Sequence, residues 1–182
     1  MKIQNSNNAI NSNFDIDKLI FEAKTQMKLL NFKKAYDLLK VSISKGLSHS
    51  DIFYLFGEVC RILKKFEESE NYLIESIKFE QHSPYVLFSL GLLYYEKQDF
   101  YASKNFLRHF LALIKSSSEA NFMISKCYVE LQKYIKALHY ITNAIENNKN
   151  ILEYFEFRAR IYEMIGLKAE AANDLKYVKF LN

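Results

Sequence analysis

Residues 84–117 read PYVLFSLGLLYYEKQDFYASKNFLRHFLALIKSS, and this stretch decides the fold. Apolar side chains recur three or four places apart within residues 86–94, and they do so again within residues 100–111. This spacing gives each half one apolar face when the chain is helical. Polar residues at 97–99 separate the two halves. The stretch therefore predicts two amphipathic helices, A and B, joined by a short turn.

The same pattern returns every 34 residues, and two columns contain only small residues. We number positions from the first residue of each repeat. Position 8 holds Ala23, Gly57, Gly91, Ser125 and Ala159. Position 20 holds Ala35, Ser69, Ser103, Ala137 and Ala171. A fixed period of this length is typical of proteins built from stacked helical hairpins.

No insertion shifts the register of these columns, so the organisation of the chain can be predicted. We expect a polar, flexible N-terminal segment at 1–15 and a single array at 16–182. The array is predicted to divide into repeats at 16–49, 50–83, 84–117, 118–151 and 152–182.

Packing within a repeat follows from the columns. Position 8 on helix A is expected to meet position 20 on helix B, because small side chains let two helices cross closely. Aromatic residues at positions 11 and 17 would fill the wider space beyond the crossing. Asn150 and Glu153 have the spacing of a capping box, which predicts the start of the last A helix.

The period and columns resemble those of the tetratricopeptide repeat. The resemblance covers residues 16–182 and is carried best by Phe53-Phe56-Gly57, Leu87-Leu90-Gly91-Tyr94, Tyr134-Ala137 and Phe155-Ala159-Tyr162-Gly166-Ala171. It implies an all-α fold, a right-handed helical-hairpin solenoid of five repeats. It also implies a non-enzymatic scaffold or adaptor that binds other proteins.

Composition excludes several other classes of protein. The net charge is only +4, which makes nucleic acid an unlikely partner because nucleic-acid binders usually carry a concentrated basic patch. The apolar stretch at 86–95 is too short to span a bilayer, and residues 1–13 contain no apolar core of a signal peptide. Two cysteines, Cys60 and Cys127, suit a reducing compartment. We therefore expect an intracellular, cytoplasmic protein without a transmembrane segment.

The sequence contains no pattern typical of catalysis or of a cofactor site. The histidines, His49, His82, His109 and His139, lack the spacing of a helical metal site. No glycine-rich phosphate loop, CxxC pair or nucleophile motif occurs. We predict no enzyme activity, cofactor, metal or small-molecule substrate, and we interpret both cysteines as buried structural thiols.

The resemblance implies that A helices line the inner groove, with positions 2, 5, 9, 12 and 13 facing it. An apolar, aromatic patch there is expected to bind a partner, since Tyr and Phe are favoured at interfaces. The alternative interpretation is packing between adjacent A helices. The predicted groove residues are Tyr54, Arg61, Tyr85, Phe88, Leu92, Tyr95, Phe122, Lys126 and Arg160.

The nature of the partner stays open at the level of sequence. Acidic residues outnumber basic ones at the groove positions, which favours an amphipathic peptide or helix with some Lys or Arg. A tetratricopeptide-type chaperone that shields an amphipathic client segment is the alternative function. The residues that grip the C-terminal tails of heat-shock chaperones in some family members do not occur here. Self-association through the uncapped C-terminal helix, near Leu175, Val178 and Phe180, is a further hypothesis.

Overall fold

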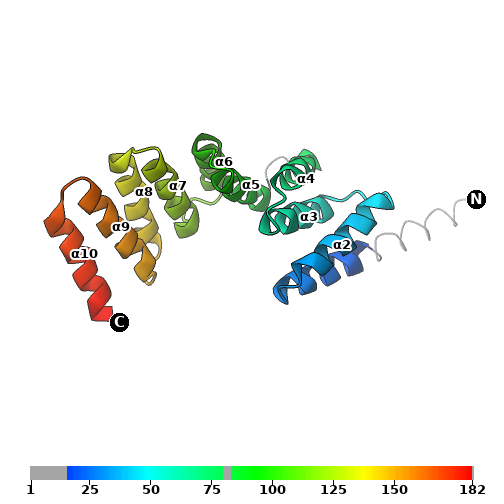
Figure 1. Ribbon diagram of the computed structural model, residues 1–182, viewed down its shortest axis with the longest axis horizontal. Helices are drawn as coiled ribbons and strands as arrows, with labels where there is room; N and C mark the ends of the chain where they lie inside the picture. The colour runs from blue at the N-terminus through cyan, green and yellow to red at the C-terminus, as the bar shows by residue number, and fades with distance from the viewer. Residues whose placement is uncertain (1–15, 80–82, 182) are drawn as a thin grey trace, which may run out of the picture. The chain divides into compact units, whose positions relative to one another are not determined.

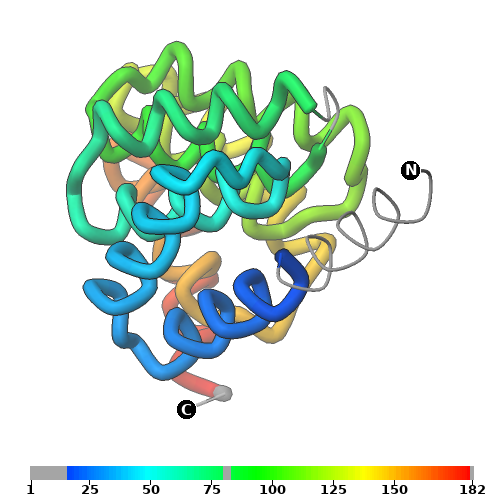
Figure 2. The backbone as a smooth tube through the Cα atoms, turned by 90° about the vertical axis from the view of Figure 1, so that its right-hand side faces the viewer, coloured from blue at the N-terminus to red at the C-terminus, as the bar shows by residue number. Residues whose placement is uncertain are grey.

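The computed structural model describes residues 16–79 and 83–181, which contain helices and short connections but no strand (Figure 1). Residues 16–28 form the first described helix. The helices that follow are α2 (Phe32–Ser44), α3 (Ser50–Ile62), α4 (Phe66–Phe79), α5 (Pro84–Glu96), α6 (Phe100–Leu113), α7 (Ser118–Glu130), α8 (Tyr134–Asn147), α9 (Leu152–Met164) and α10 (Lys168–Leu181). The tube in Figure 2 traces these helices and the short turns between them. The predicted flexible segment at 1–15 lies outside the described residues.

The chain divides into two compact units, of which unit 1 runs to Val86 and unit 2 runs from Leu87. In unit 1, α2 packs against α3 and α3 against α4. In unit 2, each helix from α6 to α10 packs against the next. The helices α3, α5, α7 and α9 begin at the first residues of four sequence repeats. Each of these is followed by a B helix, so the predicted helix-turn-helix pattern is confirmed.

All five turns between helix A and helix B have the same backbone conformation. The residue at position 15 has a left-handed φ in every repeat: Leu30 (59°), Lys64 (61°), Gln98 (62°), Gln132 (55°) and Gly166 (83°). The hydrogen bonds around Gln98 show the pattern. Gln98 N–H donates to the Tyr95 carbonyl at 3.0 Å, and Asp99 N–H donates to the Tyr94 carbonyl at 2.9 Å. These two bonds form a Schellman motif, which ends each A helix.

Four of these turns carry a side chain in a conformation that favours glycine. We expect Gln98→Gly to raise the free energy of unfolding by roughly 0.5 to 1 kcal/mol, because relief of the left-handed strain outweighs the extra chain entropy of glycine. Gly166→Ala should lower it by about 1 kcal/mol for the opposite reason. Urea unfolding followed by circular dichroism measures both variants. A destabilised Gln98→Gly variant would contradict the turn geometry.

Positions 8 and 20 meet as predicted, and serine hydrogen bonds join them in the repeats that have serine there. Ser69 Oγ donates to the Gly57 carbonyl at 2.8 Å, and Ser103 Oγ donates to the Gly91 carbonyl at 2.7 Å. In the fourth repeat the direction is reversed, and Ser125 Oγ donates to the Ala137 carbonyl at 2.7 Å. A buried hydroxyl therefore satisfies its hydrogen-bonding capacity where the helices cross.

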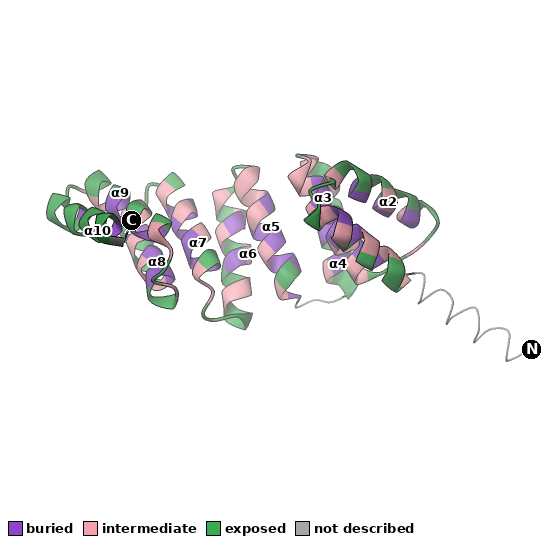
Figure 3. Ribbon diagram, turned by 90° about the horizontal axis from the view of Figure 1, so that it is seen from below, coloured by how far each residue is buried: buried purple, intermediate pink, exposed green. Residues whose placement is uncertain are grey.

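Glycine at position 8 makes room for the leucine at position 24. A Cβ atom added to Gly57 would lie 2.7 Å from Leu73 Cγ, and one added to Gly91 would lie 2.6 Å from Leu107 Cγ. Both leucines are fully buried. Figure 3 shows buried residues along the sides where helices pack, whereas α10 is mostly exposed.

The start of α9 differs from the sequence prediction. The N-cap residue is Ile151, and no side chain caps the helix. The backbone N–H of Asn150 donates to Asn148 Oδ1 at 3.1 Å. The predicted capping box of Asn150 and Glu153 is therefore wrong, because Asn150 lies one residue before the N-cap and its backbone N–H donates to Asn148 instead.

Candidate functional site

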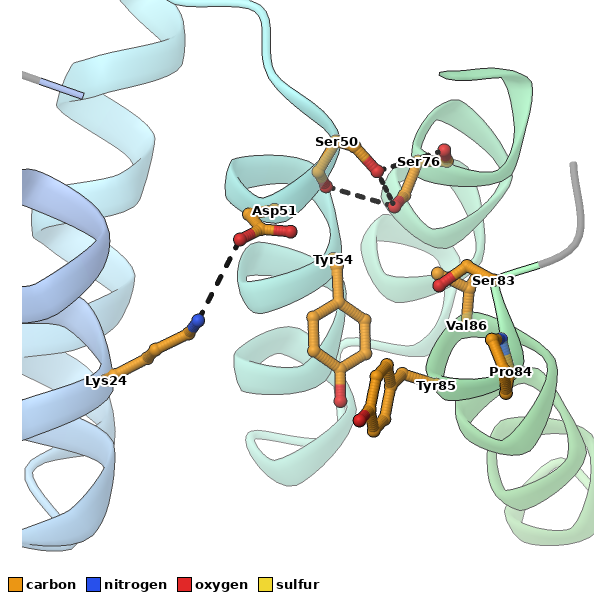
Figure 4. Close-up of a pocket in the computed structure, with 9 residues that line it drawn as sticks. All are labelled: Lys24, Ser50, Asp51, Tyr54, Ser76, Ser83, Pro84, Tyr85 and Val86. Carbon is orange, nitrogen blue, oxygen red and sulfur yellow. Dashed lines mark hydrogen bonds and ion pairs between the residues drawn. The ribbon is translucent and has the colours of Figure 1, made fainter. Parts of the chain in front are cut away.

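Unit 1 contains a pocket of about 430 Å³ at the N-terminal ends of two A helices (Figure 4). Its residues come from the first described helix, from α3 and α4, and from the start of α5. They are Lys24, Ser50, Asp51, Tyr54, Ser76, Ser83, Pro84, Tyr85 and Val86. Two of the predicted groove residues, Tyr54 and Tyr85, therefore lie in one pocket.

Hydrogen bonds and an ion pair fix part of the wall of this pocket. Ser76 Oγ donates to the Ser50 carbonyl at 3.0 Å, which joins α4 to the start of α3. Lys24 Nζ lies 3.8 Å from Asp51 Oδ2, and both side chains are about half exposed, so solvent weakens this pair. The rings of Tyr54 and Tyr85 lie 6.4 Å apart, and Tyr85 is 71% exposed.

Unit 2 contains a second pocket, of about 340 Å³, built from three consecutive A helices. One residue comes from α5, four come from α7 and three come from α9. The residues are Tyr95, Phe122, Lys126, Val129, Glu130, Glu153, Phe157 and Arg160. Four predicted groove residues therefore lie together here, and they stand at positions 5, 9 and 12, which fall on one face of an A helix.

Aromatic rings form the floor of the unit 2 pocket. Phe122 is 9% exposed, and its ring lies 4.8 Å from that of Tyr154 and 5.1 Å from that of Phe157. Most of the Phe122 side chain is therefore covered by residues of the next A helix, α9, which agrees with the alternative interpretation of the aromatic patch as packing between adjacent A helices. Burial, with a contribution from the Glu130 carboxylate, raises the pKa of Tyr95, so this hydroxyl stays protonated at neutral pH.

Two cations of the unit 2 pocket lie over aromatic rings. Lys126 Nζ is 5.2 Å from the centre of the Tyr95 ring and 5.4 Å from that of Phe122. The Arg160 guanidinium is 5.4 Å from the centre of the Phe157 ring. Contacts of this length attract a cation to the negative face of the ring. The rings thus hold both cations on the pocket surface.

Three predicted groove residues line neither pocket. Arg61 forms an ion pair with Glu58, with Nε and Oε1 3.0 Å apart. Phe88 is half-buried, and its ring lies 5.1 Å from that of Phe110 on α6. Leu92 is half-buried as well.

Sequence reasoning missed one aromatic residue of the unit 2 pocket and all three serines of the unit 1 pocket. Phe157 stands at position 6, which was not assigned to the groove, yet it supports Arg160. Ser76 belongs to a B helix and reaches the pocket through its bond to Ser50. Leu55 and Ser89 at the same position are buried, whereas Phe21 at this position is exposed, so the column gave no uniform signal.

The thiols of Cys60 and Cys127 are buried, as predicted. Burial raises the pKa of Cys60 to about 12 and that of Cys127 to about 11. Cys127 Sγ also donates to Ser103 Oγ at 3.2 Å, which places it in the hydrogen-bonded crossing of the third repeat. Reactive cysteines need an accessible thiolate, and neither residue supplies one.

We therefore expect neither thiol to react with a disulfide reagent in the native protein at mildly alkaline pH. Both should react at once after unfolding in guanidinium. A colorimetric thiol assay with and without denaturant measures this difference. Rapid reaction of one equivalent in the native state would contradict the burial of that cysteine.

Histidine, cysteine and acidic residues do not gather into a group of three that could hold a metal anywhere in the described parts of the chain. His49 caps α3 by accepting the Asp51 N–H at 3.2 Å, while His109 and His139 are exposed. His82 lies outside the described residues. Among the residues that are described, no helix is both long enough and apolar enough to cross a membrane.

Comparison with known proteins supports the repeat and the fold. A family model described as tetratricopeptide repeat matches residues 118–151, the span of the fourth repeat. No curated protein matches the sequence.

Solved structures of MamA proteins share the fold. MamA 41-end from Desulfovibrio magneticus RS-1 has a TM-score of 0.83 at 12% identity, covering 91% of this chain and 93% of that one. MamA AMB-1 has a TM-score of 0.79 at 19% identity, covering 95% and 92%. A third MamA crystal structure has a TM-score of 0.78 at 15% identity, covering 86% and 91%.

These findings and the hairpins define a class of protein: an all-α fold built from helical-hairpin repeats, as in solenoid proteins. The tetratricopeptide-repeat model matches residues 118–151, and the chain shares the MamA fold over most of its length. Proteins of this family are generally protein-interaction scaffolds.

Proposed function

We propose that this chain is a non-enzymatic scaffold or adaptor that binds other proteins through its A helices. The observation that carries the proposal is the unit 2 pocket, in which α5, α7 and α9 each contribute side chains to one concave surface. A pocket with an aromatic floor and a few charged groups fits an amphipathic peptide or helix, whose apolar side chains would lie on the floor. Tyr85 in unit 1 offers a further exposed aromatic contact.

The proposal is tested by affinity capture with two pocket variants and two controls. Tyr85→Ala removes an exposed ring of the unit 1 pocket, and Phe21→Ala is its control because Phe21 in the same unit is equally exposed, at 71%. Arg160→Glu alters the unit 2 pocket. Its control is Lys136→Glu on the B helix α8. All four residues are exposed, so the variants should keep their helicity.

We expect partners captured by the native chain to be lost from a pocket variant and retained by its control. Circular dichroism verifies that each variant is folded. Partners that bind all four variants equally would move the binding surface away from both pockets, and the proposal would fail.

The chaperone alternative uses the same surface but makes a different prediction. The aromatic floor that holds a stable partner would also cover an apolar segment of a client. Co-expression separates the two functions. A client that is soluble only with this chain is the mark of a chaperone, whereas an adaptor binds a partner that is soluble alone.

Self-association through α10 remains a prediction with its own test. The position 24 residue Leu175 is 43% exposed, whereas its equivalents Leu39, Leu73, Leu107 and Ile141 are fully buried. Phe180 is 86% exposed. If α10 joins two copies, Leu175→Lys with Phe180→Lys should convert a dimer to a monomer in sedimentation velocity. A native chain that sediments as a monomer at all concentrations would reject the hypothesis.

A further inference from the structure

The unit 2 pocket holds four charged side chains that make no ion pair with any described residue. Lys126 and Arg160 are the cations, and Glu130 and Glu153 are the anions. Lys126 and Glu130 are four residues apart on α7, a spacing that allows a surface ion pair. Lys126 instead lies between the rings of Tyr95 and Phe122. The arrangement thus leaves both signs of charge available to a ligand.

The cations and the anions of this pocket differ in depth. Lys126 is half-buried beside the aromatic floor, while Glu130 and Glu153 are exposed at the rim. Arg160 is exposed, but its guanidinium lies over the Phe157 ring. A partly desolvated charge interacts more strongly with a ligand than an exposed one, because water screens it less. At the aromatic floor, the half-buried Lys126 should therefore interact more strongly with an anionic group of a ligand than the exposed glutamates interact with a cationic one.

We propose that the unit 2 pocket recognises an acidic side chain, Asp or Glu, in a segment of a partner protein. The inference rests on the proposed function and specifies its ligand. The carboxylate pairs with Lys126 and Arg160, and an apolar side chain next to it packs on the Phe122 and Phe157 rings. Basic residues of the same segment pair with Glu130 and Glu153 at the rim.

Two features make the cations suited to this role. Lys126 is already held by two rings, so binding costs less side-chain entropy than it would for a freely rotating lysine. Arg160 presents a planar guanidinium that can bind both oxygens of a carboxylate. The sequence alone favoured a basic segment, because it counted acidic residues without showing which charges lie deep in the pocket.

The test begins with selection of short random peptides displayed on phage against the full chain. We expect the selected peptides to carry Asp or Glu next to an aliphatic or aromatic residue. Selected peptides without such an acidic residue would overturn the inference while leaving the proposed function in place. Selected peptides that bind equally well to Arg160→Glu and to the native chain would overturn the inference, and equal binding to Tyr85→Ala as well would count against the proposed function.

Fluorescence anisotropy then measures one selected peptide and its copy with Gln in place of Glu, or Asn in place of Asp. We expect Lys126→Gln and Arg160→Gln each to weaken binding of the acidic peptide about tenfold, the effect of one charge-assisted contact. The amide copy should bind weakly and respond little to either variant. Lys136→Gln is the matched control, because Lys136 lies 6.0 Å from the Tyr128 ring and lines no described pocket. Equal binding of the acidic and amide peptides would overturn the inference.

Discussion

Replacing Leu107 with alanine should lower the free energy of unfolding by about 3 kcal/mol, because this fully buried side chain leaves a cavity. Leu107 fills the space above Gly91 where α5 and α6 cross. The matched control is Leu175→Ala, at the same position of the last repeat. Leu175 is 43% exposed, so its loss should cost roughly 1 kcal/mol. Urea unfolding followed by circular dichroism measures both.

A double-mutant cycle shows whether position 91 requires glycine because Leu107 occupies the adjacent space. Gly91→Val should cost about 2 kcal/mol alone, because a Cβ there lies 2.6 Å from Leu107 Cγ. In the Gly91→Val/Leu107→Ala protein, valine occupies part of the vacated space. The double variant should therefore lose about 1 kcal/mol less stability than the sum of the losses in the two single variants. Strict additivity would mean that the two side chains do not compete for space.

Asp174→Ala should destabilise the chain by about 3 kcal/mol, because it leaves Arg158 half-buried without its partner. Arg158 Nε donates to Asp174 Oδ2 at 2.8 Å, and Nη2 donates to Oδ1 at 2.7 Å. Asp174 is 6% exposed. Hydrogen bonding to Asp174 is also the main reason that the pKa of Arg158 is raised. The pair joins α9 to α10.

The control for this prediction comes from the other repeats. The equivalent positions in the second repeat hold Phe56 and Tyr72, whose rings lie 4.5 Å apart. The fourth repeat holds Ile124 and Tyr140 there. Arg158→Ile with Asp174→Tyr should therefore leave stability unchanged or raise it, since an apolar pair can replace a buried ion pair. A double variant as unstable as Asp174→Ala would contradict this equivalence.

The periodicity of the sequence predicted the hairpins because small and apolar columns depend only on helix spacing. Gly91 and Ser103 were correctly placed at the crossing for this reason. Periodicity could not show that serine at this crossing donates a hydrogen bond to the backbone. Nor did it show that Arg158 and Asp174 form a buried ion pair, since both residue types are normally assigned to the surface.

The candidate site was predicted less completely than the hairpins. Tyr95, Phe122, Lys126 and Arg160 line one pocket, because positions 5, 9 and 12 fall on one face of an A helix. The columns could not show that Arg61 pairs with Glu58 or that the ring of Phe88 packs against Phe110. Both outcomes depend on side-chain direction, which a single sequence does not specify. The sequence also could not show that Lys126 lies deeper in the pocket than Glu130, because depth depends on side-chain direction as well.

The central claim, that partners bind on the A helices, is tested most directly by amide chemical shifts in two-dimensional NMR. A selected peptide or captured partner segment is titrated into the isotopically labelled chain. The account predicts that the largest shifts fall on α7 and α9, around Lys126 and Arg160, with small shifts on the B helices α8 and α10. Largest shifts on α8 or α10, around Ile135 or Tyr177, would contradict the account and place the binding surface on the B helices.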